Sequence, residues 1–355
     1  MKTKLLISVL LSAIILLTAC NGNAESRENS SQTSQSTGTQ SGNNSSESSQ
    51  ESDSSSSSTQ EEQKSDAPAA EESEFEYYTN RDEDTVTITG YKGKKMDVII
   101  PETIDGKKVT IIYGYSSCIF NNIKSIIIPN SVIEIGEAVF KDCERLSSIT
   151  IPDGVKKIGK NAFYRCKNLT NATIPGSVTD LCERAFGSCP ELSTVNILDG
   201  VTQIGNFAFQ ECISLSDITL PNSLTQISRG AFMGCDGLTS ISIPNSVTEI
   251  SKDAFNDCLG LTSVTLPNGL TKINDGVFSG CQSLTSVTIP DSVTEIGQWA
   301  FGFCTSLTSI TIPDSVTHID EDSFSGCENL TNAEYKGKSY DIKHIDDLYK
   351  AINGV

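Results

Sequence analysis

Cysteine is the residue type most able to do chemistry in this chain, and most of its copies occupy one column of a repeat. Nine phenylalanines lie 23 residues apart, from Phe140 to Phe324, and a cysteine follows each of them three residues later, from Cys143 to Cys327. A zinc site needs ligands that converge on a tetrahedron. A single column of thiols points one way, so we expect no metal here.

Disulfides between neighbouring turns are the second possibility for these thiols. Stacked parallel strands lie about 4.8 Å apart, which is within the Cα separation that a disulfide permits. Side chains in register run parallel, however, so their Cβ atoms are badly aimed at one another. We therefore expect a ladder of buried free thiols that pack as small hydrophobic groups. Cys182 lies outside this column, at a position that four other units fill with glycine, and is a candidate exposed thiol.

Other catalytic arrangements are weakly represented. The chain has two histidines, His318 in a column of polar residues and His344 near the end of the sequence. No Gly-x-Ser-x-Gly segment places a serine on a nucleophile turn, and no glycine-rich loop is suited to a phosphate. We expect neither enzymatic activity nor a cofactor.

The 23-residue period indicates which elements hold these columns. A fixed period of this length predicts a stack of identical units, a solenoid. In the unit 284–304, Val287 and Ile289 alternate with hydroxyl residues, as in a strand with one buried face. A Pro-Asp-Ser turn follows. Val293 and Ile296 form a second inward pair, and an Ala-Phe pair fills the far side of the unit.

The repeated segments resemble a known family. The Leu-x-x-Ile-x-Ile strand is typical of leucine-rich repeats, and the Ile-Pro-x-Ser-Val-x-x-Ile-Gly and Ala-Phe-x-x-Cys segments are similar to the BspA-like (Treponema pallidum type) repeats of bacterial surface proteins. The resemblance covers residues 98–331, about ten units. It implies a leucine-rich-repeat solenoid with short parallel β-strands, and a role in adhesion to host matrix proteins, other bacteria or glycans.

Both ends of the repeat array are predicted to be capped. Residues 75–97 form the expected N-terminal cap, in which residues 85–89 alternate like an edge strand. Residues 332–355 form the expected C-terminal cap, with a hairpin at 335–340 and a short helix that stops at Gly354.

The N-terminal segment has the features of an export signal. Two lysines precede a short apolar run, and residues 1–19 are predicted to be a lipoprotein signal peptide because the run ends in Leu-Thr-Ala-Cys20, which resembles a bacterial lipobox. A lipid on Cys20 would anchor the protein to a membrane. The alternative is an ordinary secretory signal with a chance cysteine. Residues 20–74 are rich in Ser and Glu and predict a disordered tether.

The charge of the chain narrows the possible partners. The net charge is −19, with twelve acidic and two basic residues between positions 21 and 80. This balance repels nucleic acid and anionic lipid headgroups. We expect no nucleic-acid partner, membrane contact through the N-terminal lipid alone, and a monomer at the bacterial cell surface.

The variable columns beside each phenylalanine contain the candidate binding residues. Large apolar side chains occur there where other turns have small or polar ones, at Tyr164, Phe207, Met233, Trp299 and Phe303. Exposed aromatic residues are typical anchors for a protein or glycan, and the alternative is that they fill gaps between turns. A binding protein is favoured over a non-catalytic spacer of the envelope or a protein that captures carbohydrate.

Overall fold

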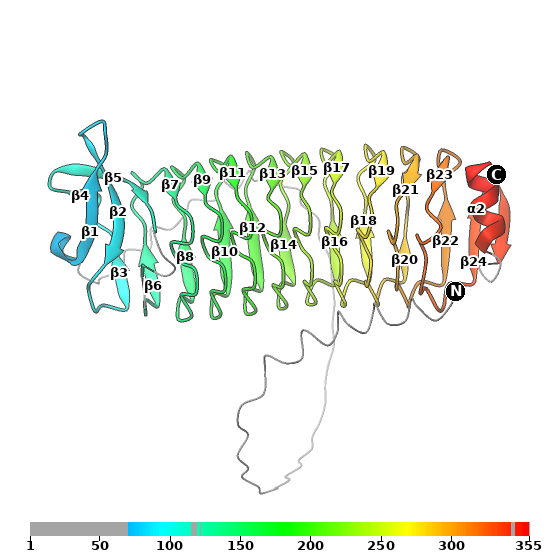
Figure 1. The fold of residues 1–355 in the computed structure, drawn as a ribbon, viewed down its shortest axis with the longest axis horizontal. Helices are drawn as coiled ribbons and strands as arrows, with labels where there is room; N and C mark the ends of the chain where they lie inside the picture. The colour runs from blue at the N-terminus through cyan, green and yellow to red at the C-terminus, as the bar shows by residue number, and fades with distance from the viewer. Residues whose placement is uncertain (1–69, 115–118, 121, 342–344, 355) are drawn as a thin grey trace, which may run out of the picture. The chain divides into compact units, whose positions relative to one another are not determined.

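The computed structural model describes residues 70–114, 119–120, 122–341 and 345–354 (Figure 1). The predicted signal peptide 1–19, the lipid site Cys20 and the tether as far as residue 69 lie outside the described residues and stay predictions.

The predicted strands form the first of two rows that run along the repeats (Figure 1). Each strand pairs in parallel with the same segment of the next turn within its sheet, as Ala172 pairs with Val195. The row consists of β3 (Asp97–Ile99), β6 (Ser125–Ile127), β8 (Ser148–Thr150), β10 (Asn171–Ile174), β12 (Thr194–Ile197), β14 (Asp217–Thr219), β16 (Ser240–Ser242), β18 (Ser263–Thr265), β20 (Ser286–Val287), β22 (Ser309–Ile312) and β24 (Asn332–Tyr335). The repeats therefore form a β-solenoid of about 11 turns.

A second row of parallel strands runs along the solenoid at the position of the second inward pair of each unit. The row consists of β2 (Thr85–Tyr91), β5 (Lys107–Ile112), β7 (Glu134–Ile135), β9 (Lys157–Ile158), β11 (Asp180–Leu181), β13 (Gln203–Ile204), β15 (Gln226–Ile227), β17 (Glu249–Ile250), β19 (Lys272–Ile273), β21 (Glu295–Ile296) and β23 (His318–Ile319). The inward pair was predicted, and both Val293 and Ile296 are fully buried. The strand itself was not predicted, because two residues are too few to show an alternating pattern.

The third side of each turn, which carries the Ala-Phe pair, is held by backbone hydrogen bonds of alternating direction. The N–H of Asn161 donates to the carbonyl of Glu183 in the next turn (3.0 Å), and that of Arg165 donates to Gly187 (3.0 Å). Between them, the N–H of Tyr164 donates back to Asn161 within its own turn (3.1 Å). Asn161 and Arg165 reach this geometry in the left-handed conformation, with φ of 56° and 61°.

The core consists of the repeated columns stacked on themselves. From Phe140 to Phe324, each phenylalanine ring stacks on the ring of the next turn, with centroids 4.8–5.7 Å apart and planes within 16° of parallel. Offset stacks of this kind stabilise a core beyond the burial of their area.

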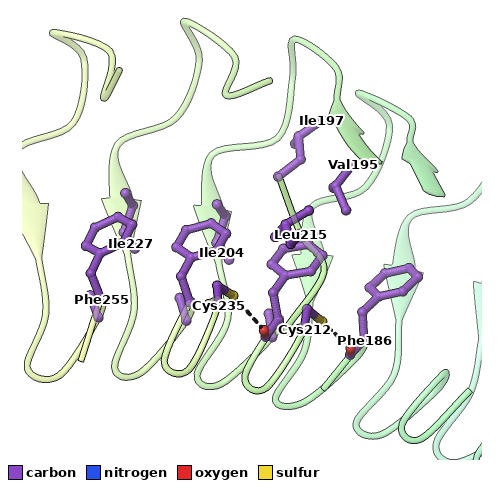
Figure 2. Packing of buried hydrophobic residues seen from close by; sticks show 14 of the residues in the cluster. Phe186, Val195, Ile197, Ile204, Cys212, Leu215, Ile227, Cys235 and Phe255 are labelled. Atoms are coloured by element: carbon purple, nitrogen blue, oxygen red, sulfur yellow. Dashed lines mark hydrogen bonds between the residues drawn. The ribbon is translucent and has the colours of Figure 1, made fainter. Parts of the chain in front are cut away.

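The cysteine column lies beside these rings (Figure 2). The thiol of Cys212 donates to the carbonyl of Phe186 in the previous turn, and that of Cys235 donates to Phe209, both over 3.2 Å. The members of the column from Cys189 to Cys327 are buried and form no disulfide. Over these residues the predicted ladder of free thiols is confirmed.

The N-terminal end of the array differs from the prediction in one strand. β2 is not an edge strand, because β1 (Phe75–Thr79) pairs with it antiparallel on one side and β5 pairs with it on the other. A short 3-10 helix, η1 (Glu72–Glu74), precedes β1, and β4 (Thr103–Ile104) forms a hairpin with β5. β1 escaped the sequence analysis because its residues, apart from Phe75, are largely polar or aromatic without a clear alternation.

The C-terminal end matches the prediction. β24 and β25 (Lys338–Asp341) form the expected antiparallel hairpin, and α2 (Ile345–Asn353) buries Leu348, Tyr349 and Ile352. Among the described residues, no helix has the length and apolar character needed to cross a membrane.

Candidate binding surface

Each turn from that of Phe140 to that of Phe301 holds two residues in the left-handed conformation, one two positions before the core phenylalanine and one two positions after it. In the first column φ lies between 52° and 64° at Ala138, Asn161, Arg184, Phe207, Gly230, Asp253, Gly276 and Trp299. In the second column φ lies between 54° and 78° at Asp142, Arg165, Ser188, Glu211, Gly234, Asp257, Gly280, Phe303 and Gly326. About half of these residues are Gly, Asn or Asp, the types that adopt this conformation most easily. That composition was the sequence signal for the conformation, and it was missed.

Trp299 and Phe303 occupy both left-handed positions of a single turn. Their rings stack on each other with centroids 5.4 Å apart and an interplanar angle of 10°. Phe303 is 46% exposed, and Trp299 is half-buried. A bulky residue in this conformation is a backbone outlier that costs on the order of 1–3 kcal/mol. The stability of the repeat alone would favour glycine at both positions.

Glycines surround this aromatic pair. The preceding turn has Gly276 and Gly280 in the same two columns, and the following turn has Gly326 in the second column. A Cβ atom on Gly326 would lie 2.5 Å from Cδ1 of Phe303, so the ring of Phe303 rests where a side chain would otherwise stand. The aromatic pair therefore occupies space that the neighbouring turns leave open.

Carboxylates border the pair on the side of the preceding turn. The side chains of Asp253 and Asp257 lean over Gly276 and Gly280, so close that a Cβ atom on either glycine would collide with a carboxylate oxygen. Asp253 forms an ion pair with Arg229 (3.3 Å). Burial, and next the nearby negative charge of Asp236, raise the pKa of Asp257.

A hydrogen-bonded group borders the pair on the side of the following turn. Nε2 of Gln298 donates to Oδ2 of Asp322 (3.3 Å), and the hydroxyl of Ser325 donates to Oδ1 of the same carboxylate (3.1 Å). The pair is thus an exposed apolar platform with hydrogen-bonding groups on two sides.

The structure separates the five candidate residues into local groups. Phe207 lies in the same column as Trp299 but four turns away, about 19 Å at the spacing of parallel strands. Its ring lies 5.0 Å from the guanidinium of Arg184 and 5.7 Å from that of Arg229. These cation–π contacts link three successive turns, and they support the gap-filling alternative for Phe207.

Tyr164 and Met233 are half-buried and lie in other turns. The ammonium of Lys141 lies 5.9 Å from the centre of the Tyr164 ring, so this ring also links adjacent turns. Of the five candidates, Trp299 and Phe303 are the two whose rings the structure brings together.

The other groups singled out by the sequence do not add a reactive centre to this surface. Cys182 is half-buried rather than exposed, and burial is the main reason that its thiol pKa is raised. A raised pKa lowers the fraction of reactive thiolate near neutral pH. Among the residues that the structure describes, no three His, Cys, Asp or Glu side chains are grouped so that they could hold a metal ion.

Comparison with known proteins identifies the repeats. The profile of the BspA type leucine-rich repeat region matches residues 110–239 and 225–346, with six copies of the repeat. A search of curated proteins finds no match.

Several solved structures are similar to the chain. A leucine-rich cell surface protein from Faecalibacterium prausnitzii is 29% identical, with 77% of this chain and 96% of that chain covered and a TM-score of 0.42. A leucine-rich repeat protein from T. pallidum is 28% identical, with coverage of 68% and 91% and a TM-score of 0.41. A leucine-rich repeat protein from Bacteroides ovatus is 28% identical, with coverage of 74% and 88% and a TM-score of 0.43.

Proposed function

Because the chain belongs to the BspA-type leucine-rich repeat family, we propose that it is a lipoprotein of the bacterial cell surface that binds an extracellular protein or glycan through its repeats. The predicted signal peptide 1–19, the lipobox-like sequence that ends at Cys20 and the Ser- and Glu-rich segment 20–74 support the location. Binding is non-covalent and takes place on the outer surface of the solenoid, as in other repeat proteins.

The observation that carries this proposal is the placement of Trp299 and Phe303. A protein that served as a spacer would gain nothing from two bulky residues in left-handed conformations with much of one ring in water. Strained residues of this kind concentrate at functional sites, and exposed aromatic residues dominate the energetics of binding surfaces. Many copies of the protein on one cell would add avidity to a weak single contact.

A binding panel tests this function. The full chain is applied to immobilised matrix proteins, mucins and glycans, beside a variant with both Trp299→Ala and Phe303→Ala. We expect saturable binding to a member of the panel, weakened at least tenfold in the double variant. Alanine already occupies the left-handed column of Trp299 at Ala138 (φ 55°), so the variant should remain folded, which circular dichroism verifies.

Phe207→Ala is the matched control for the panel. It removes an aromatic ring from the same column in a turn where the ring contacts two arginines, and we expect it to leave binding unchanged. Saturable binding that the double variant retains would reject the Trp299–Phe303 surface. The absence of saturable binding to every member of the panel would favour the spacer function.

A further inference from the structure

We propose that the Trp299–Phe303 pair is a carbohydrate site that takes a neutral sugar residue of a glycan, an inference that rests on the proposed binding function of the same surface. The two rings stack on each other at 5.4 Å and are nearly parallel, so they form a small rigid platform whose accessible part is the exposed portion of Phe303 (46%) and of the half-buried Trp299. The face of an aromatic ring is electron-rich. The C–H groups on one face of a pyranose carry the complementary partial charge, so a sugar ring can lie against such a platform.

The groups beside the platform match the hydroxyls of a sugar. Asp253 and Asp257 on one side and Asp322 on the other offer carboxylate oxygens, which accept hydrogen bonds from hydroxyl donors. Gln298 also has an amide in contact with Asp322, so donors and acceptors occur together. Charge-assisted hydrogen bonds of this kind are stronger than those between neutral groups.

The charge around the platform selects a neutral sugar over an acidic one. Three cations of the preceding turns are already occupied, because Arg229 pairs with Asp253, Lys252 with Asp275 (3.0 Å) and Lys272 with Glu295 (2.9 Å). Asp257 and Asp322 form no such pair with Lys or Arg among the described residues. A sulfate or uronate group would therefore face uncompensated carboxylates.

The distribution of apolar groups fits a sugar better than a protein partner. A stable protein interface covers about 800 Å² on each side and has a contiguous apolar centre. The exposed large apolar residues nearest in sequence, Leu259 and Ile213, lie about two and four turns from Phe303. The half-buried Asp236 lies in the turn between Ile213 and Leu259, and the exposed Asp257 lies in the same turn as Leu259. A two-ring platform among polar groups has the size of one or two sugar residues.

The glycines beside the pair keep the platform accessible. Gly276 and Gly280 have no side chain, so in these two columns the preceding turn does not cover the rings. A long side chain in either column of that turn would extend toward the rings, as Arg184 of the preceding turn does at Phe207.

Tryptophan fluorescence provides a direct test, because Trp299 is the single tryptophan of the chain. Neutral gluco-, manno-, galacto- and xylo-oligosaccharides are titrated into the full chain while the emission of Trp299 is followed. We expect a saturable shift in emission with at least one of them at millimolar concentration or below. Phe303→Ala, which keeps the reporter, should weaken that binding at least tenfold, and Phe303→Tyr should preserve it.

Two further variants locate the polar contacts. Asp257→Asn removes a charged acceptor and should weaken binding several-fold, whereas Phe207→Ala, four turns away, should leave the titration unchanged. A fluorescence response that Phe303→Ala does not alter would reject the site.

The outcomes also separate this inference from the function on which it rests. If a protein of the binding panel binds through Trp299 while every neutral oligosaccharide is silent, the carbohydrate site is wrong and the binding function stands. Binding of sulfated or uronic oligosaccharides alone would contradict the preference for a neutral sugar. Silence in both the titration and the panel would overturn the site and the proposed function together.

Discussion

At the scale of single residues, the cysteine column shows how a reactive side chain becomes part of a core. Cys258 is fully buried, and its thiol donates to the carbonyl of Phe232 over 3.1 Å. Burial raises its pKa from 9.0 to about 12. The thiol therefore satisfies a carbonyl between two turns and stays protonated, which removes it from nucleophilic and redox chemistry in the folded protein.

This raised pKa predicts a loss of stability in alkaline solution. The folded state keeps a proton on Cys258 that the unfolded chain releases above about pH 9. The free energy of unfolding is therefore unaffected by the titration of this thiol below that pH and decreases as the pH rises toward 12. Between these values each such thiol lowers the free energy of unfolding by about 1.4 kcal/mol per pH unit. Urea unfolding from pH 6 to pH 11 measures the slope.

The variant Cys258→Ala isolates the contribution of this thiol. Plotted against pH, its free energy of unfolding should have the same slope as that of the parent chain below pH 9. Above pH 9 it should fall less steeply, by the slope that one released proton causes. Equal slopes in the two proteins above pH 9 would contradict the assignment.

The left-handed positions carry the second lesson at this scale. In the sequence, the columns two positions before and after each phenylalanine vary from turn to turn. The structure shows that they have a constraint on the backbone and little on the side chain, because the alternating hydrogen bonds of that side need positive φ. Trp299 and Phe303 are informative because they satisfy this constraint at a cost.

At the scale of elements, side-chain hydrogen bonds reinforce the stacking of turns. The hydroxyl of Thr225 donates to the carbonyl of Thr202 in the previous turn (3.0 Å). Thr294 donates twice to the carbonyl of Thr271, from its backbone N–H (2.9 Å) and from its hydroxyl (3.2 Å). The Thr column that contains Thr225 and Thr294 thus has a structural use and needs no ligand to explain it.

The helix α2 ends the second row of strands through one amide side chain. Oδ1 of Asn353 accepts a hydrogen bond from the backbone N–H of Ile319 (3.0 Å), and its Nδ2 donates to the carbonyl of Ile319 (2.9 Å). The amide therefore takes the place of the next strand at the edge of β23, where backbone groups would otherwise lack this partner.

Asn353→Ala should destabilise the protein by about 1–3 kcal/mol, because it leaves a donor and an acceptor without their partners. Ala351→Ser, on the exposed face of the same helix, is the control and should change stability by less than about 0.5 kcal/mol. Urea unfolding measures both. A variant at position 353 as stable as the control would show that water replaces the amide at no cost.

At the scale of the whole molecule, the chain combines a predicted export signal, a polar segment and a repeat array. The family match concerns the repeats, whereas the anchor is an inference from the residues around Cys20. The two are independent, since a solenoid would fold equally well in a protein that was secreted without a lipid.

Cys20→Ser tests the anchor in bacterial cells that express the full chain. The parent protein should incorporate radiolabelled palmitate and enter the detergent phase of a phase-separation assay, because buried acyl chains contribute about 0.8 kcal/mol for each CH₂ group. The variant should incorporate no label and remain in the aqueous phase. If the parent and the variant partition alike, the segment is an ordinary secretory signal.

The sequence by itself determined the length of the turn and the composition of the core. Each Phe, Cys and Leu column contacts itself 23 residues further along, so a period visible in one dimension describes the packing in three. The hairpin and helix at the C-terminal end were also predictable, because turn residues and a one-sided apolar pattern are local signals.

Three features became clear only from the tertiary structure. They are the left-handed backbone on the phenylalanine side, the pairing of β1 with β2, and the contacts of each variable aromatic residue. Phe207 and Trp299 belong to the same column, yet the first contacts two arginines and the second stacks on Phe303 beside glycines. The reason is physical: whether an aromatic side chain is covered or left open depends on the side chains of adjacent turns, which are distant in sequence and become neighbours when the chain folds.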